Sequence, residues 1–152
     1  MKKKQTQSKT IQNRRARFDY ELSDNFVLGM ILNGRETKAL RLGHGQLQGA
    51  YVTIKEGELW LVNASIHGTK GIPIGDTEVT RTRKLLAKQR EINQLIAAKQ
   101  QGRNIIPTEI LIGGRFIKLR VALGKSKKQY DKRQTLKKRD DDRRARKEQS
   151  SF

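Results

Sequence analysis

The distribution of charge along the chain constrains its fold more than any other feature of the sequence. Of 152 residues, 34 are Lys or Arg and 15 are Asp or Glu, so the formal net charge is +19. Residues 1–17 hold seven cations and no acid, and residues 124–152 hold twelve cations and five acids. The part between them is close to an ordinary globular composition. We therefore expect a basic flexible N-terminus (1–12), one folded domain (13–123) and a basic C-terminal tail (124–152).

The C-terminal tail is too polar to fold alone. Leu136 and Ala145 are nearly its only aliphatic residues, so it cannot bury enough surface to offset the entropy of ordering its chain. However, it lacks Gly and Pro from Asp131 to Glu148 and is rich in good helix formers. This composition predicts a segment that is disordered alone and becomes helical when a polyanion neutralises its charge.

The excess of positive charge points to an anionic partner such as nucleic acid or a membrane surface. No stretch approaches the roughly 20 apolar residues of a spanning helix, and the lysine-rich start lacks the apolar core of a signal peptide. The chain has no cysteine, which excludes disulfides and thiol catalysis and fits a reducing compartment. We expect a cytoplasmic protein with no membrane partner.

The hydropathy pattern of the middle part predicts antiparallel strands with helices between them. The apolar run 26–32, interrupted by Gly29, predicts a buried strand with a bulge or a close backbone approach. Two hairpins are expected, one at 51–62 around Gly57 and one at 104–123 around Gly113-Gly114, with Pro107 at an edge or bulge. Helical spacing predicts a short helix at 35–42 closed by Gly43 and a long amphipathic helix at 82–101, and residues 68–75 form a long flexible connection.

These elements favour a mostly β fold. A sheet this short must curl to hide its edges, so we expect a small OB-like antiparallel β-barrel of about six strands with a short helix and one long amphipathic helix. An open α+β sandwich is the alternative. Trp60 and Tyr51 lie in hairpin strands, where burial in the core is the expected role.

The sequence offers little for catalysis or metal binding. His44 and His67 are the only histidines, and their spacing matches no metal motif, so we expect two exposed loop histidines and no cofactor. Asp140, Asp141 and Asp142 would suit a divalent metal in a nuclease, but Lys and Arg stand three and four residues away on both sides. Pairing of charges along a helix is the simpler explanation. We expect a protein that is not an enzyme.

Two groups of residues point to RNA binding. Arg81, Arg83 and Lys84 would open the long helix, with Lys88 and Arg90 on its polar side, where cations and free backbone amides reach phosphates. A solvated polar face is the alternative. In the strand 115–123, Phe116, Lys118 and Arg120 share the face opposite Ile117, Leu119 and Val121. An aromatic beside two cations suits a stacked base and its phosphates, although it can also cover a hydrophobic gap.

Four segments in order along the chain resemble one family. They are Asn-Arg-Arg-Ala-Arg-Phe-Asp-Tyr at 13–20, Gly-Arg-Glu-Thr-Lys-Ala-Leu-Arg at 34–41, Arg-Thr-Arg-Lys-Leu-Leu at 81–86 with Arg-Glu-Ile-Asn at 90–93, and Lys-Lys-Gln-Tyr-Asp-Lys-Arg at 127–133. Over residues 12–148 the chain resembles the SsrA-binding proteins, the tmRNA-binding small protein B family.

The resemblance implies an RNA-binding protein of trans-translation. Such a protein binds the tRNA-like domain of tmRNA and brings it to the A site of stalled ribosomes, while its tail occupies the empty mRNA channel near the small-subunit decoding centre. Elongation factor Tu is an indirect partner through aminoacylated tmRNA. The implied tmRNA contacts are Arg14, Arg15, Arg17, Glu36, Lys38, Arg41, Arg81, Arg83, Lys84, Leu86, Lys88, Lys118 and Arg120. The implied ribosome contacts are Lys127, Lys128, Tyr130, Asp131, Lys132, Arg133, Lys137, Lys138 and Arg139.

Three positions depart from the family pattern. Val27 stands where an acidic residue is usual, Ser126 where glycine is usual, and Lys88 where Asn or His is common. Lys88 favours a phosphate contact over a base-edge contact. The alternative function is a basic structural ribosomal protein that binds rRNA, because such proteins also combine β-barrels with basic tails.

Overall fold

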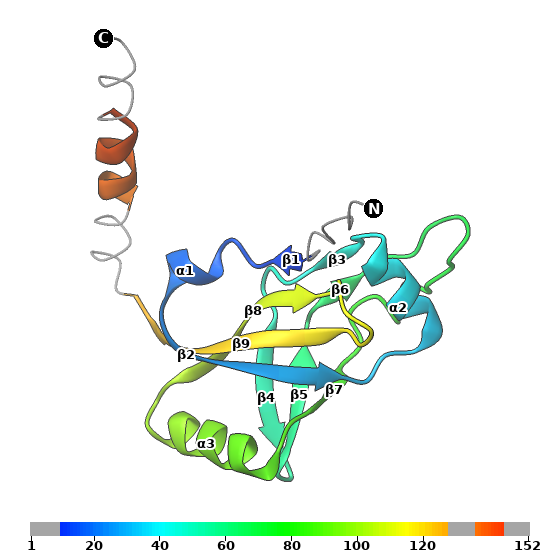
Figure 1. Ribbon diagram of the computed structural model, residues 1–152, viewed down its shortest axis with the longest axis horizontal. Coiled ribbons are helices and arrows are strands. Elements are labelled where there is room, and N and C mark those ends of the chain that lie inside the picture. Colours follow the sequence, from blue (N-terminus) through cyan, green and yellow to red (C-terminus); the bar gives the residue numbers. More distant parts are fainter. Residues whose placement is uncertain (1–9, 128–135, 145–152) are drawn as a thin grey trace, which may run out of the picture.

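The protein is mostly β with a few helices. A computed structural model describes residues 10–127 and 136–144, and Figure 1 labels the elements. The strands are β1 (Thr10–Gln12), β2 (Tyr20–Met30), β3 (Gly45–Gln46), β4 (Tyr51–Lys55), β5 (Glu58–Val62), β6 (Ser65–Ile66), β7 (Arg83–Leu86), β8 (Asn104–Leu111) and β9 (Lys118–Ser126). The helices are α1 (Ala16–Asp19), α2 (Gly34–Arg41) and α3 (Gln89–Gln100), and residues 136–144 are also helical.

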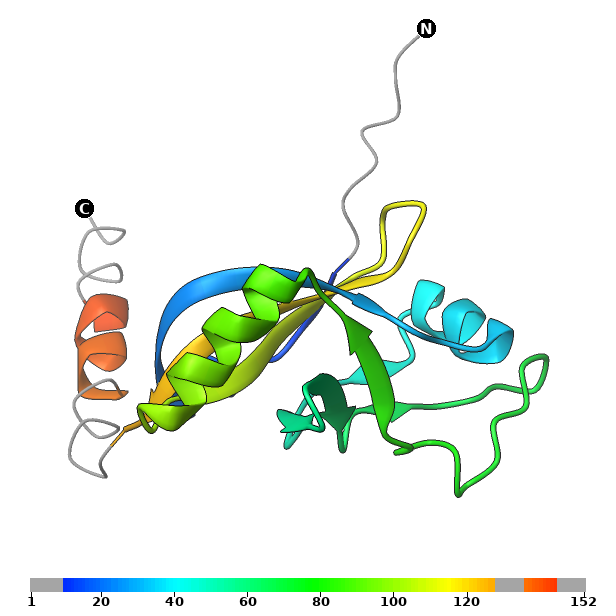
Figure 2. The ribbon, with the colours of Figure 1, turned by 90° about the horizontal axis from the view of Figure 1, so that it is seen from below.

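Six strands form a closed ring of pairings. The order is β8-β4-β5-β7-β2-β9, every pairing is antiparallel, and β9 pairs with β8 again to close the ring. β1 adds to the free side of β8, and β3 pairs with β6 in a separate small sheet. α3 lies against β8 at one end of the ring and α2 lies at the other (Figures 1 and 2). The prediction of about six antiparallel strands is confirmed at this level.

Both predicted hairpins form. β4 and β5 pair from Tyr51 with Val62 to Lys55 with Glu58, and Glu56 and Gly57 turn the chain with φ of 52° and 75°. Positive φ at both turn positions matches the right-handed twist of the strands. β8 and β9 form the second hairpin, and its register shifts between Pro107 and Glu109. Pro107 therefore marks a bulge, as its missing N–H donor predicts.

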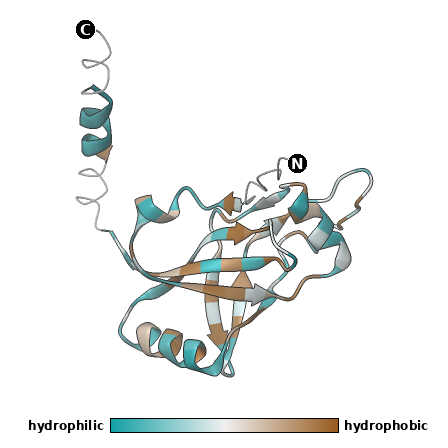
Figure 3. Cartoon of the chain, in the orientation of Figure 1, coloured by the Kyte–Doolittle hydropathy of each residue, from teal (hydrophilic) through white to brown (hydrophobic). Residues whose placement is uncertain are grey.

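Alternation of side chains along the strands fills the inside of the ring. Leu119 and Val121 of β9 are fully buried, whereas Lys118 is exposed. Leu28 of β2 and Leu61 of β5 are fully buried in the same core cluster. Figure 3 shows this alternation as brown and teal bands along the strands and a mostly teal helix at 136–144. Apolar burial inside the ring thus holds it together.

The prediction of a long helix over 82–101 is wrong for about its first third. Residues 83–86 form β7, which pairs with β2 and β5, and α3 begins only at Gln89. Arg83 and Leu85 are buried while Leu86 is exposed, which is the alternation of a strand. Over so few positions a helical period of 3.6 residues fits the same pattern, so the sequence could not distinguish the two. The backbone N–H of Lys88 donates to Glu91 Oε1 at 3.2 Å, which fixes the start of α3. Gly102, with φ of 83°, ends the turn after the helix as predicted.

The short helix α2 agrees with its prediction. Asn33 caps it, because Asn33 Oδ1 accepts from Glu36 N at 2.9 Å while Asn33 N donates to Glu36 Oε1 at 3.0 Å. Gly43 has φ of 85° just after the helix. This reciprocal cap stabilises the helix start by satisfying two backbone donors.

Three smaller expectations have mixed outcomes. Gly29 is the close backbone approach, since a Cβ there would lie 3.2 Å from Leu86 Cβ, whereas the register irregularity of β2 lies between Ser23 and Asn25. Tyr51 is not in the core, because its side of β4 faces solvent and 49% of it is exposed. Trp60 is only half-buried. Residues 68–75 contain no regular element beyond an isolated bridge between Thr69 and Ile72.

Candidate nucleic-acid interface

A buried ion cluster joins α2 to β7. Arg83 has no exposed surface and Glu36 is 1% exposed. Arg83 Nε donates to Glu36 Oε2 at 2.5 Å, and Arg83 Nη1 donates to Ala64 O at 2.7 Å. Arg83 Nη2 donates to Val79 O at 3.0 Å. Arg81, which is partly exposed, donates to the same carboxylate through Nε at 3.0 Å and through Nη2. The cluster ties the helix, the strand and the chain before it into one unit.

The cluster keeps its charges despite burial. Burial alone would raise the pKa of Glu36, but hydrogen bonds from Arg81, Asn33 and Arg83 outweigh it and hold the pKa below its ordinary value. Burial lowers the pKa of Arg83, and Glu36 opposes that effect. Because the carboxylate has charged partners on two sides, it stays ionised and the cluster stays intact at neutral pH.

The cluster changes the interpretation of two residues predicted to contact RNA. Glu36 and Arg83 are enclosed by protein, so they have no surface to offer to a phosphate or a base. Their charge also cancels locally. The sequence pattern showed only a charge run, and the strand alternation that buries Arg83 was hidden by the helical prediction. Both residues position α2 and β7 in this structure.

The outer face of β7, β2 and β9 combines apolar side chains with cations. Gly29 lies between Leu86 on β7 and Lys118 on β9, and the adjacent pair on this face is Val27 with Arg120. Leu86 is 50% and Val27 42% exposed. Gly29 has no side chain, and the side chain of Leu86 packs over it, because a Cβ at Gly29 would lie 3.2 Å from Leu86 Cβ. We call Val27, Gly29, Leu86, Lys118 and Arg120 the outer face.

Some cations of this region already have acidic partners. Lys84 Nζ lies 3.1 Å from Glu58 Oε1 in an exposed pair, and Arg120 Nη1 pairs with Glu109 Oε1. Among the residues that the structure describes, Lys38, Lys88 and Lys118 are exposed and no ion pair holds them. Among the lysines predicted to contact tmRNA, these three are therefore free to meet phosphates, as are the exposed Arg14 and Arg17.

The segment before β2 adds further cations beside the ring. Asn13 anchors it to β8 by donating from Nδ2 to Pro107 O at 2.9 Å and from N to Thr108 O at 2.8 Å. Arg14 and Arg17 are exposed, and with Arg120 they line a hollow of about 1090 Å³ between α1 and the strands. Arg15 is exposed, and its Nη2 lies 3.7 Å from Asp19 Oδ1. The segment therefore gathers cations next to the outer face.

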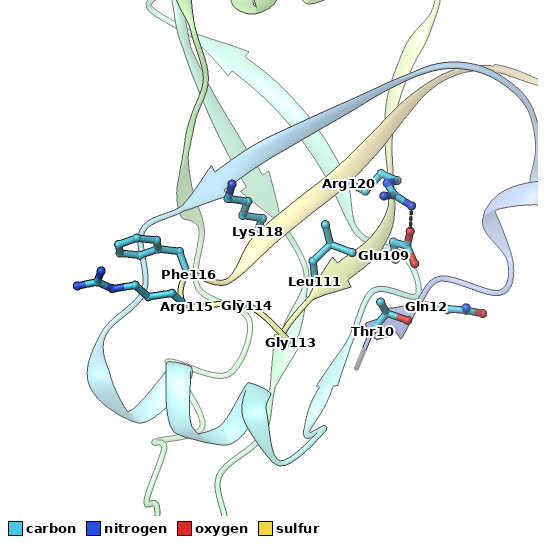
Figure 4. A pocket seen from close by; sticks show the side chains of 10 residues that line it. All are labelled: Thr10, Gln12, Glu109, Leu111, Gly113, Gly114, Arg115, Phe116, Lys118 and Arg120. Carbon is cyan, nitrogen blue, oxygen red and sulfur yellow. Dashed lines mark hydrogen bonds and ion pairs between the residues drawn. The ribbon is translucent and has the colours of Figure 1, made fainter. Parts of the chain in front are cut away.

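Arg41 has a different environment from the one expected of an RNA contact. Its guanidinium donates to three carbonyls of the loop between β8 and β9, those of Ile112, Gly114 and Arg115, at 3.0–3.2 Å. Arg41 thus holds the loop in place. Figure 4 shows that loop and the hollow beside it.

The predicted ribosome contacts fall mostly in the tail. Lys137, Lys138 and Arg139 lie in the helical residues 136–144 and are exposed, as are Asp140, Asp141 and Asp142. Lys127 N donates to Asp19 O at 3.0 Å, so the chain is attached to the ring up to that point. The remaining predicted contacts lie outside the described residues: Lys128, Tyr130, Asp131, Lys132 and Arg133.

Two further features bear on the other function classes. Over residues 10–127 and 136–144, no three His, Asp or Glu side chains gather as metal ligands. In the same part of the chain, no helix has the length and apolarity to cross a membrane. His67 is exposed, and its backbone N–H donates to the backbone carbonyl of the half-buried His44 at 2.9 Å.

The fold and the outer face define a basic, mostly β protein of the RNA-binding class. The family model described as "SmpB protein" matches residues 10–151. An SsrA-binding protein of Pseudomonas fluorescens is 44% identical over 137 residues, covering 87% of this chain and 84% of the relative. One of Sphingomonas elodea is 42% identical over 135 residues, covering 85% and 82%. The chain belongs to the SmpB family of SsrA-binding proteins.

A solved structure agrees with the sequence relatives. This structure, described as "tmRNA-SmpB: a journey to the center of the bacterial ribosome", superposes with a TM-score of 0.65 at 32% identity. The match covers 79% of this chain and 85% of that chain. The resemblance found in the sequence is therefore confirmed in sequence and in fold.

Proposed function

We propose that the protein binds the tRNA-like domain of tmRNA and carries it to stalled ribosomes in trans-translation. Membership of the SsrA-binding family carries the proposal, and the structural relative solved with tmRNA on the bacterial ribosome supports it. The outer face supplies the matching chemistry, because exposed cations lie beside the exposed apolar side chains of Val27 and Leu86 on the sheet.

The interface divides into contacting and positioning residues. We assign phosphate contacts to the exposed cations, since these lose little solvation when they meet a phosphate. We assign the packing against a base or ribose to Leu86, which packs over Gly29 and is 50% exposed. Glu36 and Arg83 act from the interior by holding β7 beside α2, and Arg41 acts by holding the loop before β9. The exposed cations proposed as phosphate contacts are Arg14, Arg15, Arg17, Lys38, Lys88 and Lys118. Arg81, Lys84 and Arg120 are half-buried and paired with Glu36, Glu58 and Glu109, so we propose that each would exchange its carboxylate for a phosphate.

The remaining details follow from this assignment. We propose that the six-stranded ring is OB-like and that residues 13–123 carry tmRNA binding. β9 continues to Ser126 and Lys127 is bonded to Asp19, so the boundary expected at 124 falls a few residues too early. We propose that the tail after Lys127 would lie in the empty mRNA channel near the decoding centre and become helical there. Elongation factor Tu would join through aminoacylated tmRNA, and the protein would act in the cytoplasm, where stalled ribosomes are.

The RNA that copurifies with the protein tests the proposal. The full-length chain and a variant with Lys84, Lys88 and Lys118 changed to Ala are expressed in bacteria, captured at moderate salt, and the bound RNA is sequenced. We expect tmRNA to dominate with the native chain and to fall strongly with the variant. Ribosomal RNA at one copy per subunit, with no enrichment of tmRNA, would overturn the proposal in favour of a structural ribosomal protein.

A further inference from the structure

The loop between β8 and β9 presents an unusually exposed aromatic side chain. Phe116 is 69% exposed, more than any other large hydrophobic residue in the described part of the chain. The residue after it, Ile117, is buried, so the backbone direction alone places the ring in solvent. Burying an aromatic ring is among the larger favourable contributions to a fold, and here that contribution is left unused. The exposed ring is therefore available to a partner.

The loop is rigid enough to act as a preformed surface. Arg41 donates three hydrogen bonds, to the carbonyls of Ile112, Gly114 and Arg115, and these hold the backbone of the loop just before Phe116. Arg115 Cζ lies 5.5 Å from the centroid of the Phe116 ring. Figure 4 shows the two side chains projecting together from the loop. Because the backbone of the loop is held in place, less conformational entropy is lost when a ligand stacks on the side chains that the loop presents.

The surroundings of the ring select the chemistry of the ligand. A hollow of about 910 Å³ begins at Phe116 and continues over Lys118 and Arg120 toward Gln12 on β1. Lys118 has no acidic partner among the described residues, and its exposed side chain keeps the ammonium group in solvent. An aromatic face next to cations in a polar groove suits an unpaired nucleobase with its phosphates.

We propose that Phe116 and Arg115 form a stacking platform for an unpaired base of RNA, and that Lys118 neutralises the phosphate beside that base. The proposal rests on the proposed function for the choice of RNA as ligand. The base can belong to tmRNA or to ribosomal RNA, and the chemistry is the same for both. Arg41 is a positioning residue, because it shapes the loop and its donors are used by carbonyls.

Binding of three RNAs to matched variants tests the platform. The variants are Phe116→Ala, Phe116→Leu and Phe116→Trp, with Tyr51→Ala as control because Tyr51 is also a half-exposed aromatic on a strand. The RNAs are a transcript of the tRNA-like domain, purified small ribosomal subunits, and a short unstructured oligonucleotide. Binding is measured over a range of salt concentrations, and circular dichroism checks that each variant is folded.

Stacking and charge leave different signatures. Phe116→Ala and Phe116→Leu should weaken binding about 5- to 100-fold to the RNA that supplies the base, with an unchanged salt slope. Phe116→Trp should restore binding, and on a Trp60→Phe background its fluorescence should be quenched by that RNA. Loss with the transcript alone assigns the base to tmRNA, and loss with the subunits alone assigns it to ribosomal RNA. Native affinity of Phe116→Ala and Phe116→Leu for all three RNAs would overturn the platform.

The result separates the platform from the proposed function. If the native chain binds the tRNA-like transcript but the Phe116 variants bind equally well, the platform fails and the function stands. If the native chain does not prefer that transcript over the oligonucleotide, the proposed function fails, while quenching by the oligonucleotide still supports the platform. Adding Arg41→Ala to Phe116→Ala should cost no further RNA affinity, because we expect Arg41 to act only by positioning the aromatic ring of Phe116. Additive losses would contradict the positioning role.

Discussion

Removing Arg83 should destabilise the fold instead of weakening a phosphate contact. Arg83→Met replaces the aliphatic stem of arginine with an unbranched apolar side chain and removes the guanidinium, so the variant leaves no large cavity. It removes one charged partner of Glu36 and the donors to Ala64 O and Val79 O, all in the interior. Breaking a buried ion pair from one side costs about 3–5 kcal/mol, because the other charge stays buried. Arg81 remains as a partner, so we expect a value near the lower end, about 3 kcal/mol.

Urea unfolding of the full-length protein measures this effect. For a small domain, a loss of about 3 kcal/mol with a urea slope of about 1–3 kcal/mol/M lowers the midpoint by more than about 1 M. Arg81→Met, which removes the half-exposed partner, should lower it much less. Glu36→Gln combined with Arg83→Met should be more stable than Arg83→Met alone, since a buried carboxylate with one remaining charged partner is then replaced by a neutral amide. An unchanged midpoint for Arg83→Met, together with a lower salt slope of RNA binding, would refute the structural assignment.

The same cluster predicts a direction for stability against pH. The pKa of Glu36 is lower in the folded protein than its ordinary value near 4.5. Its ionised form therefore stabilises the fold at pH above that ordinary value, and this contribution is lost as the pH falls through the lower folded-state pKa. Glu36→Gln should make the free energy of unfolding depend less on pH in that acidic range, as urea midpoints at several pH values would report.

The other predictions concern binding and the tail. Changing Lys88 and Lys118 to Ala should lower the salt slope of tmRNA binding by about 0.7–0.9 per contact without changing the urea midpoint; an unchanged slope would assign them to a solvated face. A chain that ends after Lys127 should keep the thermal midpoint and most tmRNA affinity but lose peptide tagging on stalled ribosomes; a lower midpoint would show that the tail stabilises the ring. Asp131→Ala with Lys132→Ala and Arg133→Ala should abolish tagging while tmRNA binding persists, and exchanging these residues with Lys137, Lys138 and Arg139 should not restore it. Full tagging by a charge-matched scrambled tail would leave only nonspecific tethering.

Local turn chemistry made the hairpins predictable. Gly57 and Pro107 act through backbone geometry that depends on few neighbours, so the β4–β5 hairpin and the bulge in β8 could be found from sequence. The cap of α2 is equally local, with Asn33 and Glu36 three residues apart. The pairing of β8 with β9 also followed from the second hairpin, whereas the closure of the ring depends on β2 and β4, which are far away in sequence.

The junction between β7 and α3 could not be found in the same way. Leu85 and Leu86 fit a helical stripe as well as a strand, and the difference depends on pairing with β2 and β5, which are far away in sequence. The burial of Arg83 depends on Glu36, which lies 47 positions earlier. A charge with its partner on another element looks the same in sequence as a charge in solvent. Candidate RNA contacts drawn from charge runs therefore include interior residues.

This distinction matters for how the protein uses its net charge of +19. A cation that already donates to protein, such as Arg83 to Glu36 or Arg41 to three carbonyls, must break those bonds before it can reach RNA. Such a cation contributes rigidity, which lowers the entropic cost of binding for the surfaces that it supports. The exposed lysines Lys38, Lys88 and Lys118 contribute attraction and release of counterions instead. The ring thus presents a few available cations and apolar surfaces in fixed positions, whereas the twelve cations of residues 124–152 supply most of the charge that we propose for the mRNA channel.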